Sequence, residues 1–397
     1  MSIPKKALGH VRVLDMSQFT PGPLCAQILG DLGAEVIKIE RPNGNDDRRA
    51  TPLVRGFGVY YALNNRDKKT VTLNLKQAKG ADLLRQLVGR ADILIENYRP
   101  GFLAQLGLGY DDLRKANPKL IMISVTGFGQ TGPYKDRGGF DMIAQAVGGL
   151  MSLNGDADDP PLKAGTSTAA MVTGLNAAIG ALAALQHRDR TGEGQWIDVA
   201  LLDSAVSQIE ADLPYFGLTG DVLPRVGNRR LYSAPANVFK ATDGFVYIAP
   251  GVDAIWKRLC RVIGRADLAD HPDYLTNEAR IRRVEDVERV VQEWVTPRNK
   301  DEVVALLVEA EVPCGVVNDV REVLDDPQVG ARQMVVTASH PTMGDMPVPG
   351  QPLKMSGTPL KSGRMVFDPG QHNSEVYGEL LNLTLDELQS LQKAGVI

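Results

Sequence analysis

The first part of the chain alternates short apolar runs with a longer helical stretch. Residues 11–15 and 36–40 are short apolar runs that predict two buried strands. Between them, Pro21 suits the first turn of a helix, and Gly33 suits its end. Two strands joined through one helix form a βαβ unit, in which the strands pair in parallel through a right-handed crossover.

The same alternation continues along the first half of the chain. Further strands are predicted at residues 70–75, 93–96, 120–126 and 195–200. Further helices are predicted at residues 80–88, 111–115 and 175–187, the last rich in alanine. Strands that alternate with helices predict a doubly wound α/β domain.

The composition of the sequence changes after residue 213. Residues 214–232 are rich in glycine, proline and arginine and indicate a linker, and residues 238–240 and 245–249 predict a hairpin. Helices at 254–263, 284–295 and 300–309, a short strand near 312–317 and a terminal helix at 384–393 follow. We expect a large domain of residues 1–213 and 335–397, linkers at 214–227 and 326–334, and a small α+β domain at 228–325.

Composition excludes several classes of function. The 397 residues suffice for two domains, and a net charge of −4 argues against a general nucleic-acid or membrane-surface binder. The most apolar run, 175–185, is too short to span a bilayer. Cys25, Cys260 and Cys314 lie far apart and lack the spacing of metal ligands. We expect a cytoplasmic protein that has buried thiols and no metal site.

One motif resembles a dinucleotide-binding loop but is not followed by the helix that such a loop requires. Gly127, Gly129 and Gly132 match the GxGxxG pattern after a predicted strand. A dinucleotide fingerprint must open a helix, whereas Pro133 and further loop-forming residues follow here. The glycines are better explained by turns and by close backbone approach to a ligand.

Cationic, amide and aromatic side chains follow several predicted strands. Arg41 follows the second strand, Lys76 a later one, and Asn97, Tyr98 and Arg99 come directly after another. Ligands sit at the carboxyl edge of a parallel sheet, so together these groups suit an adenine, ribose and phosphate moiety. Each of them alone also fits an ordinary solvated loop.

These segments together resemble the class III CoA-transferases, the family of formyl-CoA transferase and carnitine CoA-transferase. The match lies in residues 11–15, 33–42, 91–101, 155–174, 191–195, 312–319 and 326–328, and it runs nearly end to end. The resemblance implies a Rossmann-like large domain built from both chain ends, a smaller α+β domain, and two chains interlocked as a homodimer.

The resemblance also implies a reaction. Such enzymes move CoA from an acyl-CoA to a free carboxylic acid through an aspartate that forms a mixed anhydride and then an aspartyl-CoA thioester. The aspartate position falls on Ala170, and a methyl group can neither attack a carbonyl nor carry an acyl group. We therefore expect a chain that binds CoA esters and transfers little or no CoA, as an engineered variant or as a natural pseudoenzyme.

The resemblance implies binding residues at the positions that match the family's motifs. The implied CoA contacts are Thr20, Pro21, Arg41, Leu73, Lys76, Asn97, Tyr98 and Arg99, and the implied lining of the route to the thioester is Gly138, Gly139, Phe140 and Asp141. The pattern departs at Thr20, where formyl-type transferases have glutamine, and at Gln105, where arginine is common. These departures leave the donor and acceptor acids open.

Two functions are alternatives to a transferase that lacks its nucleophile. The α-methylacyl-CoA racemases share the fold and use a histidine and an aspartate, but these positions hold Phe140 and Ala170 here. A CoA-ester-binding protein without turnover is the other alternative. Arginines in predicted loops would suit a second carboxylate and thus favour a succinyl-CoA donor: Arg48, Arg49, Arg137, Arg229 and Arg230.

Overall fold

The computed structural model describes residues 6–360, 363 and 365–397, and it divides into two compact units. The first unit contains both chain ends: Met1–Leu150, Lys163–Leu213 and Gln328–Ile397. The second unit comprises Met151–Leu162 and Pro214–Pro327. The expected boundaries differ from this division at residues 151–162 and 214–227, which cluster with the second unit.

The first unit is built on a six-stranded sheet in which all strands run parallel. Its strands are β1 (Arg12–Asp15), β2 (Glu35–Glu40), β5 (Lys69–Thr72), β6 (Ile93–Glu96), β7 (Ile121–Thr126) and β8 (Trp196–Ala200). Their order is β5-β2-β1-β6-β7-β8, so the direction of winding reverses between β1 and β6. The predicted doubly wound α/β fold is confirmed.

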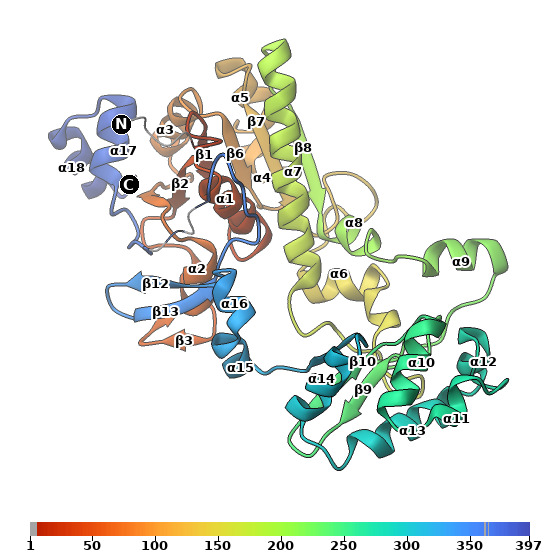
Figure 1. Cartoon of the computed structure of the whole chain (residues 1–397). Coiled ribbons are helices and arrows are strands. Elements are labelled where there is room, and N and C mark those ends of the chain that lie inside the picture. Colours follow the sequence, from red (N-terminus) through yellow and green to blue (C-terminus); the bar gives the residue numbers. More distant parts are fainter. Residues whose placement is uncertain (1–5, 361–362, 364) are drawn as a thin grey trace. The chain divides into compact units, whose positions relative to one another are not determined.

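The two faces of this sheet carry separate hydrophobic cores, because successive side chains of a strand point to opposite faces. Val13 of β1 packs in the core that includes α1 (Pro21–Asp31) and α7 (Thr168–Thr191). Leu14, its neighbour, packs in the core that includes α3 (Ala78–Val88) and the two C-terminal helices. These are α17 (Asn373–Leu381) and α18 (Leu385–Lys393). Figure 1 shows α7 as one long helix beside β8.

Helix α7 packs closely because its inner side is made of small residues. Ala177 and Ala181 are fully buried, and a side chain at Gly174 would meet the carbonyl oxygen of Pro21 at 2.9 Å. The helix is longer at both ends than the predicted 175–187, and by length and apolar composition it could cross a membrane. Half of its most apolar window is buried in the unit, as in the core helix of a globular domain.

The second unit is a small α+β domain around the buried side chain of Trp256. The predicted hairpin is confirmed as β9 (Asn237–Lys240) and β10 (Phe245–Ile248), which pairs in turn with β11 (Cys314–Val316). The helices that fall in this unit are α10 (Asp253–Val262), α11 (Ala266–Ala269), α12 (Asn277–Arg282), α13 (Val284–Val295), α14 (Lys300–Glu309) and α15 (Val320–Asp325).

Several elements escape the sequence pattern. The predicted linker contains α9 (Asp212–Thr219), and the proline-rich tail contains the hairpin of β12 (Val335–His340) and β13 (Gly344–Pro349). Prolines are tolerated in β13 because the hairpin has only two strands, both of them edges. The remaining short elements are η1 (Asp46–Arg49), β3 (Leu53–Val54), β4 (Phe57–Gly58), α2 (Val59–Asn64), α4 (Phe102–Gln105), α5 (Tyr110–Ala116), α6 (Asp141–Val147), η2 (Leu150–Leu153), α8 (Leu201–Val206) and α16 (Pro327–Ala331).

The C-terminal segment covers the free edge of the sheet at β5. The Tyr377 hydroxyl donates to the carbonyl oxygen of Thr72 at 2.7 Å, and the Thr72 N–H donates to the Asn373 side chain at 2.9 Å. The N–H of His372 donates to the carbonyl oxygen of Thr70 at 2.9 Å. An open edge strand invites pairing with other chains, so these bonds both satisfy and protect it.

The contact at the sheet edge predicts that the Tyr377 hydroxyl stabilises the folded protein. Tyr377→Phe should lower the free energy of unfolding by about 1–2 kcal/mol, because the buried Thr72 carbonyl loses its donor. Denaturant unfolding of the two proteins measures the difference. The Tyr377→Ala variant, which also removes the buried ring, should lose about 3–5 kcal/mol. Equal stability of the phenylalanine variant and the parent would contradict this account of the edge.

Candidate active site

The site lies where the winding of the sheet reverses, at the carboxyl ends of β1 and β6. Ligands of open α/β sheets bind at such switch points. The loop after β1, residues 17–20, and the loop after β6 are tied together here by Asn97. Its side chain accepts the N–H of Gln18 at 2.9 Å and donates to the carbonyl oxygen of Gln18 at 2.8 Å. The amide predicted to contact CoA is thus engaged with the protein's own backbone.

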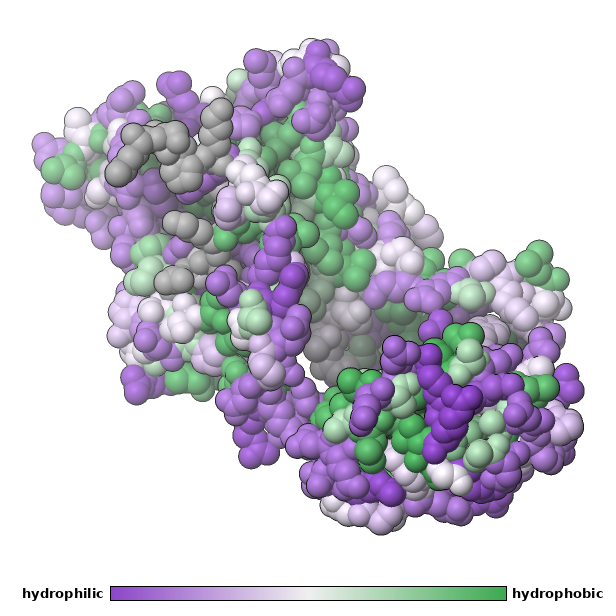
Figure 2. Space-filling model, viewed as in Figure 1, coloured by the Kyte–Doolittle hydropathy of each residue, from purple (hydrophilic) through white to green (hydrophobic). Residues whose placement is uncertain are grey.

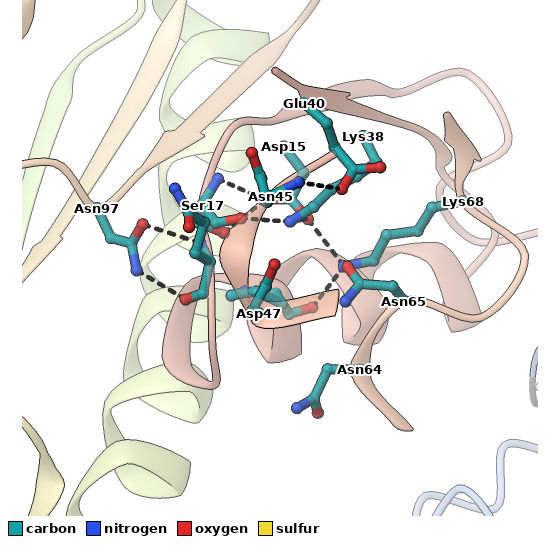
Figure 3. A network of polar contacts seen from close by, with 12 residues as sticks. Asp15, Ser17, Lys38, Glu40, Asn45, Asp47, Asn64, Asn65, Lys68 and Asn97 are labelled. Carbon is teal, nitrogen blue, oxygen red and sulfur yellow. Dashed lines mark hydrogen bonds and ion pairs between the residues drawn. The ribbon is translucent and has the colours of Figure 1, made fainter. Parts of the chain in front are cut away.

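A charged network lies buried beneath the loop after β1 (Figure 3). The Asp15 carboxylate faces two ammonium groups, Lys38 at 3.2 Å and Lys68 at 2.8 Å, and all three side chains are fully buried. Burial raises the pKa of Asp15, but the two lysines outweigh it and bring the pKa to about 2. Burial lowers the pKa of Lys68 to about 8.

This network also fixes the backbone of the loop. Lys38 donates to the carbonyl oxygen of Ser17, and Lys68 donates to that of Pro23 at 2.8 Å. Breaking a buried ion pair by removing one partner typically costs about 3–5 kcal/mol, so the backbone held by these lysines is firmly anchored. Sequence reasoning missed both lysines. The available signal was Lys38, a charged residue in a strand flanked by apolar ones and expected to be buried on both faces.

Ala170, the position that the resemblance implies for the nucleophile, lies in the first turn of α7. Ala170 is 3% exposed, and its N–H donates to Oδ1 of Asp141 at 2.9 Å. The other oxygen of Asp141 accepts the side-chain amide of Gln145 at 2.6 Å, and Gln145 in turn accepts the N–H of Ala164 at 3.0 Å. Asp141 therefore ties the start of α6 to the start of α7, a contact that spacing in the sequence does not reveal.

Two glycines bring Asp141 to this place. A side chain on Gly127 would meet the Cα of Gly139 at 2.7 Å, so the two backbones touch where only glycine fits. The GxGxxG loop leads through turns to α6, which starts at Asp141, and opens no helix of its own. Phe140, directly before Asp141, is 64% exposed, and its ring lies edge-on to that of Phe19 at 6.1 Å between centroids.

The other predicted contact residues have mixed environments. Thr20 is buried with its hydroxyl bonded to Tyr60, and Pro21 is the buried first residue of α1. Leu73 is buried in the sheet core and offers a ligand almost no surface. Arg41 is exposed and paired with Asp46 at 2.6 Å.

The cations and aromatic group after the later strands lie nearer to solvent. Lys76 and Arg99 are exposed, as is Gly138. Tyr98 is partly buried and packs against Phe102, with 4.9 Å between ring centroids. Lys76 and Arg99 are therefore accessible to an anionic ligand.

Most of the predicted loop arginines are occupied by intramolecular contacts. Arg48 pairs with the buried Glu40 at 2.6 Å, and Arg229 pairs with Glu288 at 2.8 Å. Arg137 stacks on the ring of Tyr134 at 3.7 Å. The argument that these groups await a second substrate carboxylate therefore weakens at three of the five positions.

The three cysteines are free, and burial raises the pKa of Cys260 to about 12 and that of Cys25 further. No cluster of three or more His, Cys, Asp or Glu side chains that could hold a metal ion occurs among the described residues.

Glu96, at the end of β6, is a buried acid. It directly precedes Asn97, whose two hydrogen bonds to the backbone of Gln18 form a clamp, here called the Asn97 clamp. Oε2 of Glu96 accepts the N–H of Tyr98 at 2.8 Å, and Glu96 hydrogen-bonds with Ser124, which also accepts the Trp196 indole N–H at 2.9 Å. Burial raises the pKa of Glu96 to about 7, helped by the like charge of Asp198 and opposed by these hydrogen bonds.

This acid predicts an unusual pH dependence of stability. The folded protein holds the Glu96 proton more tightly than the unfolded chain, so its contribution is complete below pH 4.5 and is lost as the pH rises through about 7. Glu96→Gln should remove a decline of about 3 kcal/mol over that interval. Denaturant unfolding of both proteins between pH 4 and 8 measures it. Parallel stability curves would contradict the assignment.

Comparison with known proteins identifies the family. Residues 8–373 match CoA-transferase family III. The chain is 36% identical to the succinyl-CoA–D-citramalate CoA-transferase of Chloroflexus aurantiacus over 397 residues, 99% of each chain. It is 38% identical to the succinate–glutarate CoA-transferase of Agrobacterium fabrum, covering 95% of this chain and 96% of that one.

A solved structure agrees with this assignment. The crystal structure of a CaiB/BaiF family protein from Brucella suis superposes with a TM-score of 0.85 at 35% identity, covering 93% of this chain and 98% of that one. The resemblance seen in the sequence motifs is thus confirmed, and the chain belongs to CoA-transferase family III.

Proposed function

We propose that this chain is a cytoplasmic CoA-transferase whose nucleophile position holds Ala170, so that it binds acyl-CoA and a small carboxylic acid but transfers CoA very slowly. The observation that carries the proposal is the bond from the Ala170 N–H to Asp141, which fixes residue 170 in the first turn of a long helix. The names of the two relatives above support succinyl-CoA as donor and a dicarboxylate as acceptor.

An aspartate at this position would be well placed for nucleophilic catalysis. The start of a helix carries a partial positive charge, which stabilises a carboxylate and the oxyanions of acyl transfer. Attack of the carboxylate on the thioester expels CoA thiolate and forms a mixed anhydride. The thiolate then attacks the aspartyl carbonyl, which releases the donor acid and leaves an aspartyl-CoA thioester.

The second half of the exchange reverses these steps with the acceptor. The acceptor carboxylate attacks the aspartyl-CoA thioester, expels the thiolate and forms a new anhydride. The thiolate then attacks the acceptor's carbonyl, giving the product thioester and regenerating the aspartate. Ala170 can start none of these steps, and the phenyl ring of Phe140 cannot supply the proton transfer that a racemase needs.

Coenzyme A binding is proposed for the groups around the switch point. The exposed cations Arg41, Lys76 and Arg99 suit the phosphates. The remaining proposed contacts are uncharged: Thr20, Pro21, Leu73, Asn97, Tyr98, Gly138 and Gly139. Asp141 acts through residue 170, whose backbone it holds.

Restoring the carboxylate tests the proposal. Ala170→Asp should raise the rate of CoA transfer from succinyl-CoA to a panel of small mono- and dicarboxylates by about a thousandfold or more. Thioester exchange is followed by chromatography of the acyl-CoA products. Ala170→Asn, which has nearly the same size but no nucleophilic carboxylate, should remain at the parent rate.

Two outcomes would contradict the proposal. Brisk transfer by the parent chain would show that Ala170 is no obstacle to catalysis. Binding of acyl-CoA by the Ala170→Asp protein without transfer to any acid would favour a CoA-ester-binding protein instead. Exchange of the α-hydrogen of a 2-methylacyl-CoA for deuterium would indicate racemase chemistry.

We also propose that two copies of the chain associate through α7. Its outer side exposes a row of apolar side chains spaced one turn apart, Met171, Leu175 and Ile179, and α6 adds Met142 and Val147. Figure 2 shows apolar side chains gathered along α7. Apolar patches of this kind on a monomer mark association surfaces.

A charge within this row tests the dimer. Ile179→Asp should shift the parent dimer toward monomer in sedimentation velocity at micromolar concentration, because the carboxylate would lose its water in the interface. Leu385→Asp, which changes an exposed leucine at the start of α18, is the matched control and should leave the dimer intact. A monomeric parent, or a dimer unaffected by Ile179→Asp, would contradict the proposal.

A further inference from the structure

The loop after β1 uses its backbone in an unusual way. In many α/β proteins the N–H groups of this loop hold a phosphate. Here Ser17 donates its N–H to Asp15 at 3.0 Å, Gln18 to Asn97 at 2.9 Å, and Phe19 to Asp47 at 3.0 Å. These N–H groups are already engaged, so this stretch of the loop presents side chains to a ligand.

Phe19 is the side chain that the loop presents most openly. Its backbone has φ +64°, the left-handed region that bulky residues rarely adopt, and its ring is 39% exposed. Such strain persists only where the surroundings impose it, and it gathers at functional sites. The Asn97 clamp on Gln18 and the Asp47 bond to the Phe19 N–H impose it here.

Asp47 holds the N–H of Phe19 at a cost in folding stability. The side chain is fully buried, and its Oδ1 has no hydrogen-bond partner in the described part of the chain. Burial also raises the pKa of Asp47. A buried carboxyl that is only half satisfied destabilises the fold, so its presence requires an explanation other than stability.

The Phe19 ring packs against the ring of Phe140. Phe19 meets Phe140 edge to face, with ring centroids 6.1 Å apart and planes at 87°. Phe140 immediately precedes Asp141, which accepts the N–H of Ala170. One short chain of contacts therefore links Asp47, through two exposed rings, to residue 170.

We propose that Phe19 and Phe140 form an aromatic wall that packs against the methylene carbons of the acyl group, and that Asp47 is the positioning residue that holds Phe19 in this wall. This inference rests on the proposed function, since it assumes an acyl-CoA whose thioester lies at residue 170. The wall selects short acyl chains by contact with their carbons, while the nucleotide end of CoA binds elsewhere.

The wall predicts a change in selectivity. The Phe19→Ala variant should bind succinyl-CoA about tenfold more weakly than the parent, measured by titration calorimetry, while its affinity for free CoA stays unchanged. This change corresponds to the loss of aromatic contact area beside the acyl group. Asp47→Ala, which frees the Phe19 N–H, should weaken succinyl-CoA binding in the same selective way.

Asp47→Asn is the matched control, because its side-chain oxygen can still accept the Phe19 N–H. It should keep the parent ratio of succinyl-CoA to CoA affinity. A merely structural role of Asp47 would lower the melting temperature without moving that ratio. Since Phe19 is exposed, its alanine variant tests the wall even if Asp47→Ala does not fold.

The outcomes separate the two proposals. If the parent binds both compounds and Phe19→Ala leaves the ratio unchanged, or weakens both equally, the aromatic wall is wrong while the proposed function stands. If the parent binds neither succinyl-CoA nor CoA, the proposed function fails first. A selective loss in Phe19→Ala that Asp47→Ala does not reproduce would overturn the positioning role of Asp47.

Discussion

The structure of the site depends on one buried carboxylate held between two buried ammonium groups. Asp15 ends β1, Lys38 lies in β2 and Lys68 immediately precedes β5, so the ion pairs join the carboxyl end of β1 to β2 and to the amino end of β5. The lysines also donate to backbone carbonyl oxygens, Lys38 to that of Ser17 in the loop after β1 and Lys68 to that of Pro23 in the first turn of α1. The backbone that follows β1 is thereby anchored to buried side chains of the sheet, which is a condition for precise positioning of a ligand.

A second constraint fixes the position of residue 170. The close contact of Gly127 with Gly139 brings Asp141 to the start of α7, where its carboxylate accepts the Ala170 N–H. The helix that begins there is held along its inner side by alanine packing. The start of α7 is therefore held in one place relative to the start of α6.

The apolar character of α7 serves more than one purpose. Its small inner residues let α1 approach closely, whereas its larger outer residues are exposed in the single chain. A helix that is apolar on both sides is typical of positions between two packed layers. Among the described residues, the outer side of α7 has no such second layer over it.

Much of this could be read from the amino-acid sequence. The alternation of apolar runs and helices predicted the parallel sheet, and the ordered motifs predicted the family, because both reflect local patterns. Ala170 stood out for the same reason, since a motif position is a local property. The hairpin of β12 and β13 and helix α17 were missed, because proline-rich segments and short helices owe their structure to the surfaces they cover.

The contacts that shape the site were decided by tertiary structure alone. Lys68 is buried, the Asn97 side chain holds the backbone of Gln18, and Asp47 holds the N–H of Phe19. Each of these side chains meets a partner from a distant part of the chain. The spacing of residues in a sequence carries information about neighbours on one strand or helix, whereas the meeting of separate strands at a sheet edge arises only when the chain folds.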